Sequence, residues 1–211
     1  MKIAIIAAAG KQGSLLVKEA LSRGHQVTAI VRSEDKANIQ ASKVLVKDLF
    51  DLTYEDIKEN DVIIDAFGAW TPETVGLHQT SLKHLADILS GKANRLLVVG
   101  GAGSLYVDNE HKTRVMDTPD FPADWKPLAS NMGAAFEALQ KRNDVNWTYL
   151  SPSANFVADG PRTGKYKIGK DKLMLNSKDE SMISYADYAI AMIDEAENAK
   201  YIKERFTVVS E

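Results

Sequence analysis

Short apolar runs recur along the chain and alternate with longer amphipathic segments. Several of the runs, such as Val62–Ala66, lack a regular alternation of polar and apolar residues, which is typical of strands in a parallel sheet that helices cover on both faces. The runs predict strands at Ile3–Ala7, Gln26–Val31, Val44–Val46, Val62–Ala66, Arg95–Val99, Trp147–Leu150 and Phe206–Val209.

The segments between these strands carry apolar residues at helical spacing, as Leu82, Leu85 and Leu89 illustrate. Alternating strands and helices predict a Rossmann-like α/β fold, a doubly wound parallel sheet with helices on both faces and right-handed crossovers. The predicted helices are Ser14–Arg23, Tyr54–Glu59, Val75–Leu89, Ala129–Lys141 and one that starts after Ser184, a residue suited to capping a helix N-terminus.

Two segments interrupt this alternation. Leu105–Leu128 is long and polar and contains three prolines, so we expect either a lid over a functional site or a surface excursion. Tyr166–Leu175 predicts a small β-hairpin. No linker or internal repeat divides the chain, and we expect a single domain over residues 1–211, with a core at about 1–150 and a small substrate-side lobe with the closing strand at about 151–211.

Composition narrows the functional class. The 211 residues are 45% hydrophobic and 26% charged, as in ordinary soluble domains, and the net charge of −3 gives no electrostatic case for nucleic acid or a membrane as partner. The chain has no cysteine, and its four histidines form no ligand-spaced cluster with carboxylates, so we expect no metal site.

The N-terminus predicts neither a signal peptide nor a membrane span, and we expect a cytoplasmic protein. The oligomeric state stays open.

The turn between the first strand and the first helix carries the clearest chemistry. Its sequence, AAAGKQG over residues 7–13, is rich in small residues and precedes a helix start. Unpaired N–H groups there attract anions, and small residues let a pyrophosphate approach the backbone. The alternative is a tight turn without a ligand, because alanine replaces the first glycine of the usual fingerprint. We expect a dinucleotide site formed by Ala8, Ala9, Gly10, Lys11, Gln12 and Gly13.

The residue after the second strand indicates which dinucleotide is bound. Proteins that select NAD usually place Asp or Glu there, bonded to the ribose 2′-hydroxyl. Arg32 occupies this position, and a guanidinium matches a 2′-phosphate in charge and geometry. We therefore expect NADP to be favoured, with NAD as the alternative. Arg32 could also be a solvated charge at the end of the strand, without a role in binding. Asp48, after the third strand, is expected near the adenine or as a cap of the turn that follows it.

Beyond these residues, the chain resembles the atypical short-chain dehydrogenase/reductase superfamily over nearly its whole length. The resemblance is to the NAD(P)H-binding proteins named NADH-flavin reductases, which are related to biliverdin reductase B and to NmrA-like proteins. The motifs that carry it are AAAGKQG at 7–13, VTAIVR at 27–32, VIIDAFG at 62–68, LLVVGGAGSL at 96–105, WTYLSPS at 147–153, RTGKY at 162–166 and ISYADYA at 183–189.

The resemblance implies an NAD(P)H-dependent oxidoreductase that reduces flavin or a similar planar small molecule by hydride transfer. It also implies that Ser104 lies near the nicotinamide and donates a hydrogen bond, whereas a turn serine that caps the backbone is the alternative. The cofactor would further contact Ala66, Phe67, Gly68, Gly100 and Pro152.

One departure from the superfamily concerns chemistry. Its typical members carry Tyr-x-x-x-Lys on the helix after the fifth strand, where this chain has NMGAAF at 131–136. Carbonyl reduction by the tyrosine mechanism is therefore unsupported, and the same absence weighs against an epimerase-like enzyme. A non-catalytic NADP-binding sensor or regulator of the NmrA-like type remains the alternative to a reductase.

Overall fold

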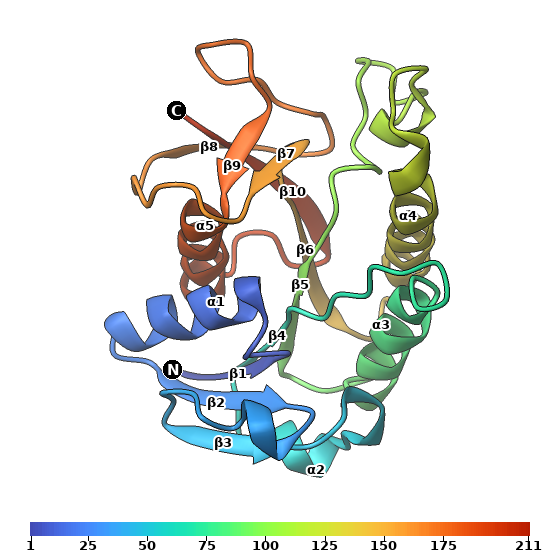
Figure 1. Ribbon diagram of the computed structural model, residues 1–211. Coiled ribbons are helices and arrows are strands. Elements are labelled where there is room, and N and C mark those ends of the chain that lie inside the picture. The colour runs from blue at the N-terminus through green and yellow to red at the C-terminus, as the bar shows by residue number, and fades with distance from the viewer.

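The computed structural model describes residues 1–211 and is built on an eight-stranded sheet (Figure 1). The strand order is β3-β2-β1-β4-β5-β6-β10-β8, and every neighbouring pair is parallel except the antiparallel pair of β10 with β8. The strands are β1 (Lys2–Ile6), β2 (Gln26–Val31), β3 (Lys43–Val46), β4 (Val62–Asp65), β5 (Arg95–Val99), β6 (Asn146–Ser151), β8 (Tyr166–Gly169) and β10 (Glu204–Ser210).

Helices cover both faces of this sheet, as Figure 1 shows. On one face α1 (Lys11–Ser22) packs against α5 (Tyr185–Asn198), and on the other α3 (Leu77–Ile88) packs against α4 (Lys126–Gln140). A short helix, α2 (Tyr54–Ile57), precedes β4. Each face has its own apolar core, and the inner strands are almost entirely buried. The predicted fold class, a doubly wound sheet between two helical layers, is confirmed.

The order of the strands creates a crevice beside β1. The chain runs outward from β1 to β2 and β3, and then crosses back to β4 on the other side of β1. The connections that leave β1 and β4 therefore turn to opposite faces of the sheet, which opens a space at the carboxyl ends of these strands. Ligands of open α/β sheets bind at such a switch point.

The segment that was predicted to form a hairpin, Tyr166–Leu175, pairs differently. Only β8 is a strand, and it adds antiparallel to β10, with Ile168 opposite Val208. This prediction was wrong because the far edge of β10 offers unpaired backbone groups that a neighbouring strand can satisfy. A second, two-stranded parallel sheet joins β7 (Asn155–Val157) to β9 (Met182–Ser184).

The segment Leu105–Leu128 is anchored at its base. Leu105 and Met116 are buried, and the N–H groups of Val115 and Met116 donate to carbonyls at positions 105 and 103. The last part of the segment belongs to α4, which starts at Lys126, earlier than expected, because proline is tolerated in the first turn of a helix. Trp125 is 54% exposed and does not line the cavities described below.

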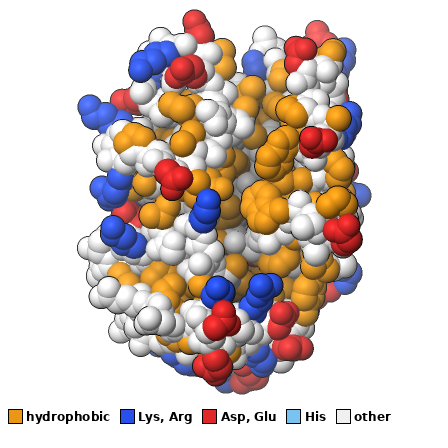
Figure 2. All heavy atoms as spheres, in the orientation of Figure 1, with side chains coloured by type: hydrophobic (Ala, Val, Ile, Leu, Met, Phe, Trp, Pro, Cys, Tyr) orange, Lys and Arg blue, Asp and Glu red, His pale blue; other side chains and the backbone are white.

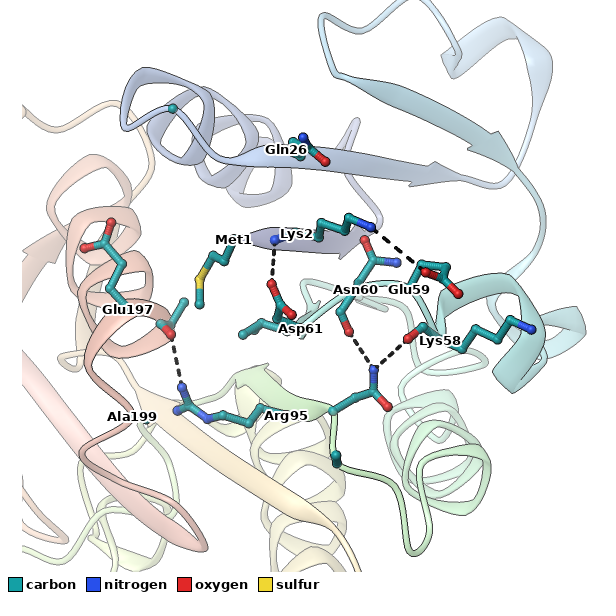
Figure 3. Close-up of a pocket in the computed structure, with 15 residues that line it drawn as sticks. Met1, Lys2, Gln26, Lys58, Glu59, Asn60, Asp61, Arg95, Glu197 and Ala199 are labelled. Carbon is teal, nitrogen blue, oxygen red and sulfur yellow. Dashed lines mark hydrogen bonds and ion pairs between the residues drawn. The ribbon is translucent and has the colours of Figure 1, made fainter.

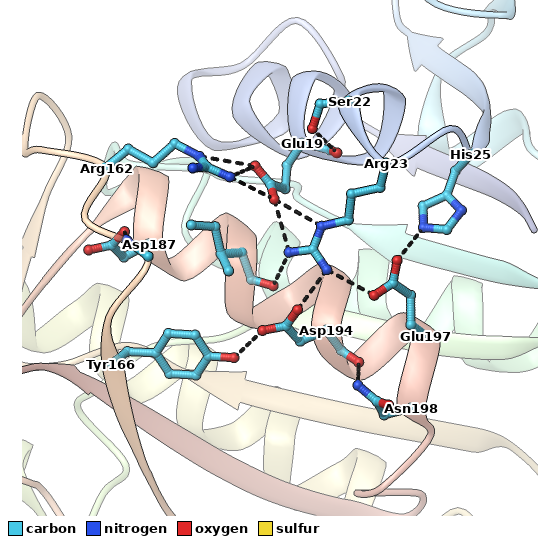
Figure 4. Close-up of polar contacts among 12 residues, drawn as sticks. Glu19, Ser22, Arg23, His25, Arg162, Tyr166, Asp187, Asp194, Glu197 and Asn198 are labelled. Atoms are coloured by element: carbon cyan, nitrogen blue, oxygen red, sulfur yellow. Dashed lines mark hydrogen bonds and ion pairs between the residues drawn. The ribbon is translucent and has the colours of Figure 1, made fainter.

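A network of ion pairs fastens the chain before β8 to α1 and α5 (Figure 4). Arg162 pairs with Glu19 at 2.8 Å, and Arg23 pairs with the same carboxylate at 2.9 Å. Asp187, in the first turn of α5, accepts a hydrogen bond from the backbone N–H of Thr163 at 2.8 Å. These contacts fix α1 and α5 relative to each other.

Across the structure, helices stay too short or too polar to cross a membrane.

Candidate functional site

The turn after β1 is tight enough to require glycine at one position. A Cβ atom on Gly13 would lie 2.3 Å from the carbonyl oxygen of Ala7, a distance that real Cβ atoms do not reach. At Gly10 the same oxygen would be 3.1 Å away, and the Gly10 N–H donates to it at 2.9 Å. Ala7 itself has a φ of 56°, in the left-handed region that favours glycine.

The start of α1 offers free hydrogen-bond donors. No side chain caps the helix at Gly10, and the first intrahelical bond runs from the Ser14 N–H to the Gly10 carbonyl. The N–H groups of Lys11, Gln12 and Gly13 consequently have no partner in the protein. Three donors at the positive end of a helix fit an anionic group such as a pyrophosphate.

A cavity of about 360 Å³ lies on the β2–β3 side of this turn, and we call it the cationic cavity. Arg32, Lys36 and Lys47 line it, and Arg32 forms no ion pair. Lys47 is bonded to Asp56 at 2.7 Å, whereas the carboxylate nearest to Lys36 is 3.5 Å away. The other lining residues are Ile6, Ala7, Ala9, Gly10, Ile30, Val31, Asp48, Leu49, Phe50, Phe67, Gly68 and Leu77.

A second cavity, of about 610 Å³, lies on the other side of the turn, and we call it the aromatic cavity. It shares residues 7, 10, 67 and 68 with the cationic cavity, so the two form one cleft. Figure 2 shows hydrophobic side chains gathered along this hollow, with Lys and Arg side chains at its lower end. Its lining includes Lys11, Gln12, Ala66, Phe67, Trp70, His78, Val99, Gly100, Leu128, Met132, Pro152, Ser153, Phe156 and Tyr185.

Burial favours the neutral forms of His78 and Tyr185, two ionisable residues that line the aromatic cavity. His78 is 8% exposed, its Nε2 lies 3.1 Å from the Ala69 carbonyl, and desolvation lowers the pKa of its imidazole. Desolvation also raises the pKa of the Tyr185 phenol, so this hydroxyl stays protonated. The Tyr185 ring packs on Phe156 with centroids 4.0 Å apart. Lys11 is the one charged side chain in the lining.

Most residues predicted for the cofactor site lie around this cleft. Ala8 is instead fully buried, and its N–H donates to the Ile30 carbonyl, while Gly13 packs against the turn. Asp48 caps the turn after β3, where its Oδ1 accepts from the Phe50 N–H at 2.9 Å, and it also lines the cationic cavity. The expected residues that line one or both cavities are Ala9, Gly10, Lys11, Gln12, Arg32, Asp48, Ala66, Phe67, Gly68, Gly100 and Pro152.

Ser104 lies outside both cavities. Its side chain is buried, and its Oγ accepts a hydrogen bond from Nη1 of Arg205 at 3.0 Å. The same nitrogen donates to the Ser104 carbonyl, and Arg205 is ion-paired to Asp171 at 2.8 Å. The hydroxyl is thus engaged with a buried arginine, a partner that lies 101 residues away in the sequence.

Sequence reasoning missed Lys36, Lys47 and Tyr185 as cleft residues. Lys47 follows β3 directly, as Arg32 follows β2, so the rule that placed Arg32 at the carboxyl edge of the sheet could also have found Lys47. Tyr185 follows the capping residue of α5, and its position depends on how that helix packs on α1. No signal in the sequence shows this.

A larger cavity, of about 750 Å³, lies at the opposite edge of the sheet, where the strands begin (Figure 3). It carries charges of both signs, and many of its polar groups bond to each other or to the backbone. Asp61 accepts from the Lys2 N–H at 2.8 Å, and Arg95 donates to the Ala196 carbonyl at 3.1 Å. Because ligands of such sheets bind at the carboxyl ends of the strands, we take the cleft as the candidate functional site. No group of three or more His, Asp or Glu side chains is arranged to hold a metal ion.

Comparisons with known proteins identify the family. Residues 7–198 match the family described as NAD(P)H-binding. "Uncharacterized protein YwnB" of Bacillus subtilis (strain 168) is 52% identical, with 100% of this chain and 99% of that protein covered. A crystal structure from Streptococcus pneumoniae TIGR4, of a protein named as a candidate NADH-flavin reductase, is 47% identical with a TM-score of 0.96 and full coverage of both chains. One from Bacteroides thetaiotaomicron, named as a candidate epimerase, is 38% identical with a TM-score of 0.85, covering 99% of this chain and 96% of that one. The chain therefore belongs to the NAD(P)H-binding family.

Proposed function

We propose that this protein is an NADPH-dependent reductase that passes a hydride to a planar small molecule such as a flavin. The observation that carries the proposal is that two unlike cavities meet at one turn whose backbone N–H groups are free. The cationic cavity suits a phosphorylated adenosine, and the aromatic cavity suits stacked rings. A relative that is 47% identical and is named as a candidate NADH-flavin reductase supports the same activity.

The preference for NADPH rests on uncompensated positive charge. Arg32 has no carboxylate partner, so its guanidinium is free to bind a 2′-phosphate through two parallel hydrogen bonds. Lys36 is exposed and would add a second cation. The cavity contains a single acidic side chain, Asp48, with one oxygen already bonded to the Phe50 N–H. Its other oxygen would accept from the adenine amino group.

The acceptor side depends on packing and on neutral hydrogen bonds. When bound, NADPH supplies the hydride from its nicotinamide ring. Trp70, Phe156 and Tyr185 would hold a flat acceptor against that ring and exclude water. The Tyr185 hydroxyl, which makes no hydrogen bond in the protein, would donate to the acceptor. This arrangement suits a reaction that needs alignment more than a strong acid.

The test compares both nucleotides on two variants. Isothermal titration should show wild type binding NADPH at least about tenfold more tightly than NADH, since a charged hydrogen bond contributes about 1.5–3 kcal/mol. Arg32→Glu should weaken NADPH binding and remove most of that preference. Lys18→Glu makes the same charge change on an exposed residue outside the cleft and should preserve the preference.

Turnover is measured by NADPH oxidation with added flavin, and the proposal requires that it exceed the rate without enzyme. Equal affinities of wild type for NADPH and NADH would refute the cofactor assignment. Tight NADPH binding without oxidation by flavin, quinone or bilin acceptors would instead favour the NADP-binding sensor.

A further inference from the structure

One polar atom at the cleft lacks a partner. Gln12 is the second residue of α1, is 7% exposed and lines the aromatic cavity. Its Nε2 donates to the Tyr185 carbonyl at 3.2 Å, but its Oε1 is buried and accepts no hydrogen bond. A buried amide oxygen without a donor is unfavourable, and such groups are rare in folded proteins.

Rotating the Gln12 amide by 180° would not give its buried oxygen a hydrogen-bond donor. If the oxygen and nitrogen of Gln12 exchanged places, the oxygen would face the Tyr185 carbonyl, which is also an acceptor. The bond to Tyr185 therefore leaves Oε1 as the free acceptor. The cleft thus presents an acceptor close to the three free backbone donors at the start of α1.

An acceptor, Oε1 of Gln12, beside the backbone donors of α1 restricts the kind of ligand that can bind here. Phosphate oxygens are acceptors, so they can satisfy the N–H groups of α1 but not Oε1 of Gln12. The ligand must offer an O–H or N–H group beside its anionic group. A dinucleotide has such donors on both sides of its pyrophosphate. Gln12 lines the aromatic cavity and not the cationic one, which points to the nicotinamide side.

We propose that Oε1 of Gln12 accepts a hydrogen bond from the nicotinamide nucleoside, either from a ribose hydroxyl or from the carboxamide. This inference rests on the proposed binding of NADPH. Through its two ends the Gln12 amide would join the cofactor to the first residue of α5, whose Tyr185 ring lines the acceptor side. Gln12 would thereby set the nicotinamide against the acceptor.

The experiment titrates three ligands of increasing length into wild type and Gln12→Met. They are 2′,5′-ADP, 2′-phospho-ADP-ribose and NADP⁺. Methionine keeps the length of the side chain but removes both ends of the amide, the acceptor Oε1 and the Nε2 that donates to the Tyr185 carbonyl. The comparison among the three ligands, rather than the loss alone, therefore identifies the acceptor. We expect 2′,5′-ADP to bind both proteins equally and NADP⁺ to bind the variant about threefold to tenfold more weakly, the effect of one neutral hydrogen bond. A loss that first appears with 2′-phospho-ADP-ribose identifies the ribose, and one confined to NADP⁺ identifies the carboxamide.

Gln26→Met is the matched control, because Gln26 is exposed at the opposite edge of the sheet, and it should leave all three affinities unchanged. If Gln12→Met fails to fold, Gln12→Ala gives the same comparison. Equal losses for all three ligands, or no loss for any, would overturn the inference while leaving NADP⁺ binding by the wild type established. A wild-type protein that binds none of the three would overturn the proposed function, and this inference with it.

Discussion

The carboxyl group of Asp65 offers a direct test of how burial acts in this fold. Asp65 ends β4, is 5% exposed, and its Oδ1 accepts from the Phe67 N–H at 3.0 Å. Desolvation raises the pKa of this carboxyl from 3.8 to about 6, and the hydrogen bond offsets only part of the shift. The folded protein therefore retains the Asp65 proton at pH values where the unfolded chain has released it.

The change Asp65→Asn should stabilise the protein at neutral pH. A raised folded-state pKa gives stability that is complete below about pH 4 and is lost as the pH rises through about 6. A shift of about 2 pKa units corresponds to about 3 kcal/mol. Asparagine has no proton to lose and can keep the bond to the Phe67 N–H, so the variant should gain about 2–3 kcal/mol over wild type between pH 4 and pH 8.

The assay is urea unfolding of both proteins across this pH range, and the quantity of interest is the difference in unfolding free energy. Taking the difference cancels the titration of all other groups. Asp120→Asn, at an exposed residue without an ion pair, should give a difference near zero throughout. A difference between Asp65→Asn and wild type that does not change with pH would show that the Asp65 carboxyl is not perturbed by burial, and the reasoning would fail.

Two further predictions concern residues near the cleft. Gly13→Ala should lower the unfolding free energy by about 1–3 kcal/mol, because the new Cβ atom would collide with the Ala7 backbone. Gly76→Ala is the control, because nothing lies within 4 Å of its new atom. Equal melting temperatures for the two variants would contradict the close approach at Gly13. Ser104→Ala should lower the unfolding free energy by about 1 kcal/mol, because Arg205 loses a hydrogen-bond acceptor. It should change the affinity for NADPH less than twofold. A large loss of NADPH affinity with an unchanged unfolding free energy would place Ser104 at the cofactor.

Local pattern was enough to predict the fold class. The apolar strands and amphipathic helices each follow from short stretches of sequence, and β–α alternation limits the topology to few solutions. The hairpin at Tyr166–Leu175 failed for a different reason. Whether β8 pairs with its own continuation or with β10 depends on an edge that forms only in the folded sheet. That contact joins Ile168 to Val208, far along the chain, and no local signal contains it.

In the candidate site, too, some positions follow from local sequence and others depend on distant contacts. Gly10, Lys11 and Arg32 follow strand ends, and strand ends meet at one edge of a parallel sheet, so their position could be predicted from the sequence. Ser104 also follows a strand end, but its hydroxyl turns to Arg205, a residue of β10 whose charge is buried. A buried guanidinium needs acceptors, and this need decides the direction of the serine.

The departure of the turn from the glycine fingerprint can be explained residue by residue. The fingerprint combines two separate demands, a backbone conformation and a close approach. Ala7 meets the conformational demand at a φ of 56°, which costs an alanine about 1 kcal/mol, a small part of the stability of a domain. Gly13 meets the demand for close approach, where a Cβ atom has no room. Alanine can thus replace the first glycine of the fingerprint but not the last. The turn after β1 keeps its shape with a substitution that a strict search for the glycine motif would reject.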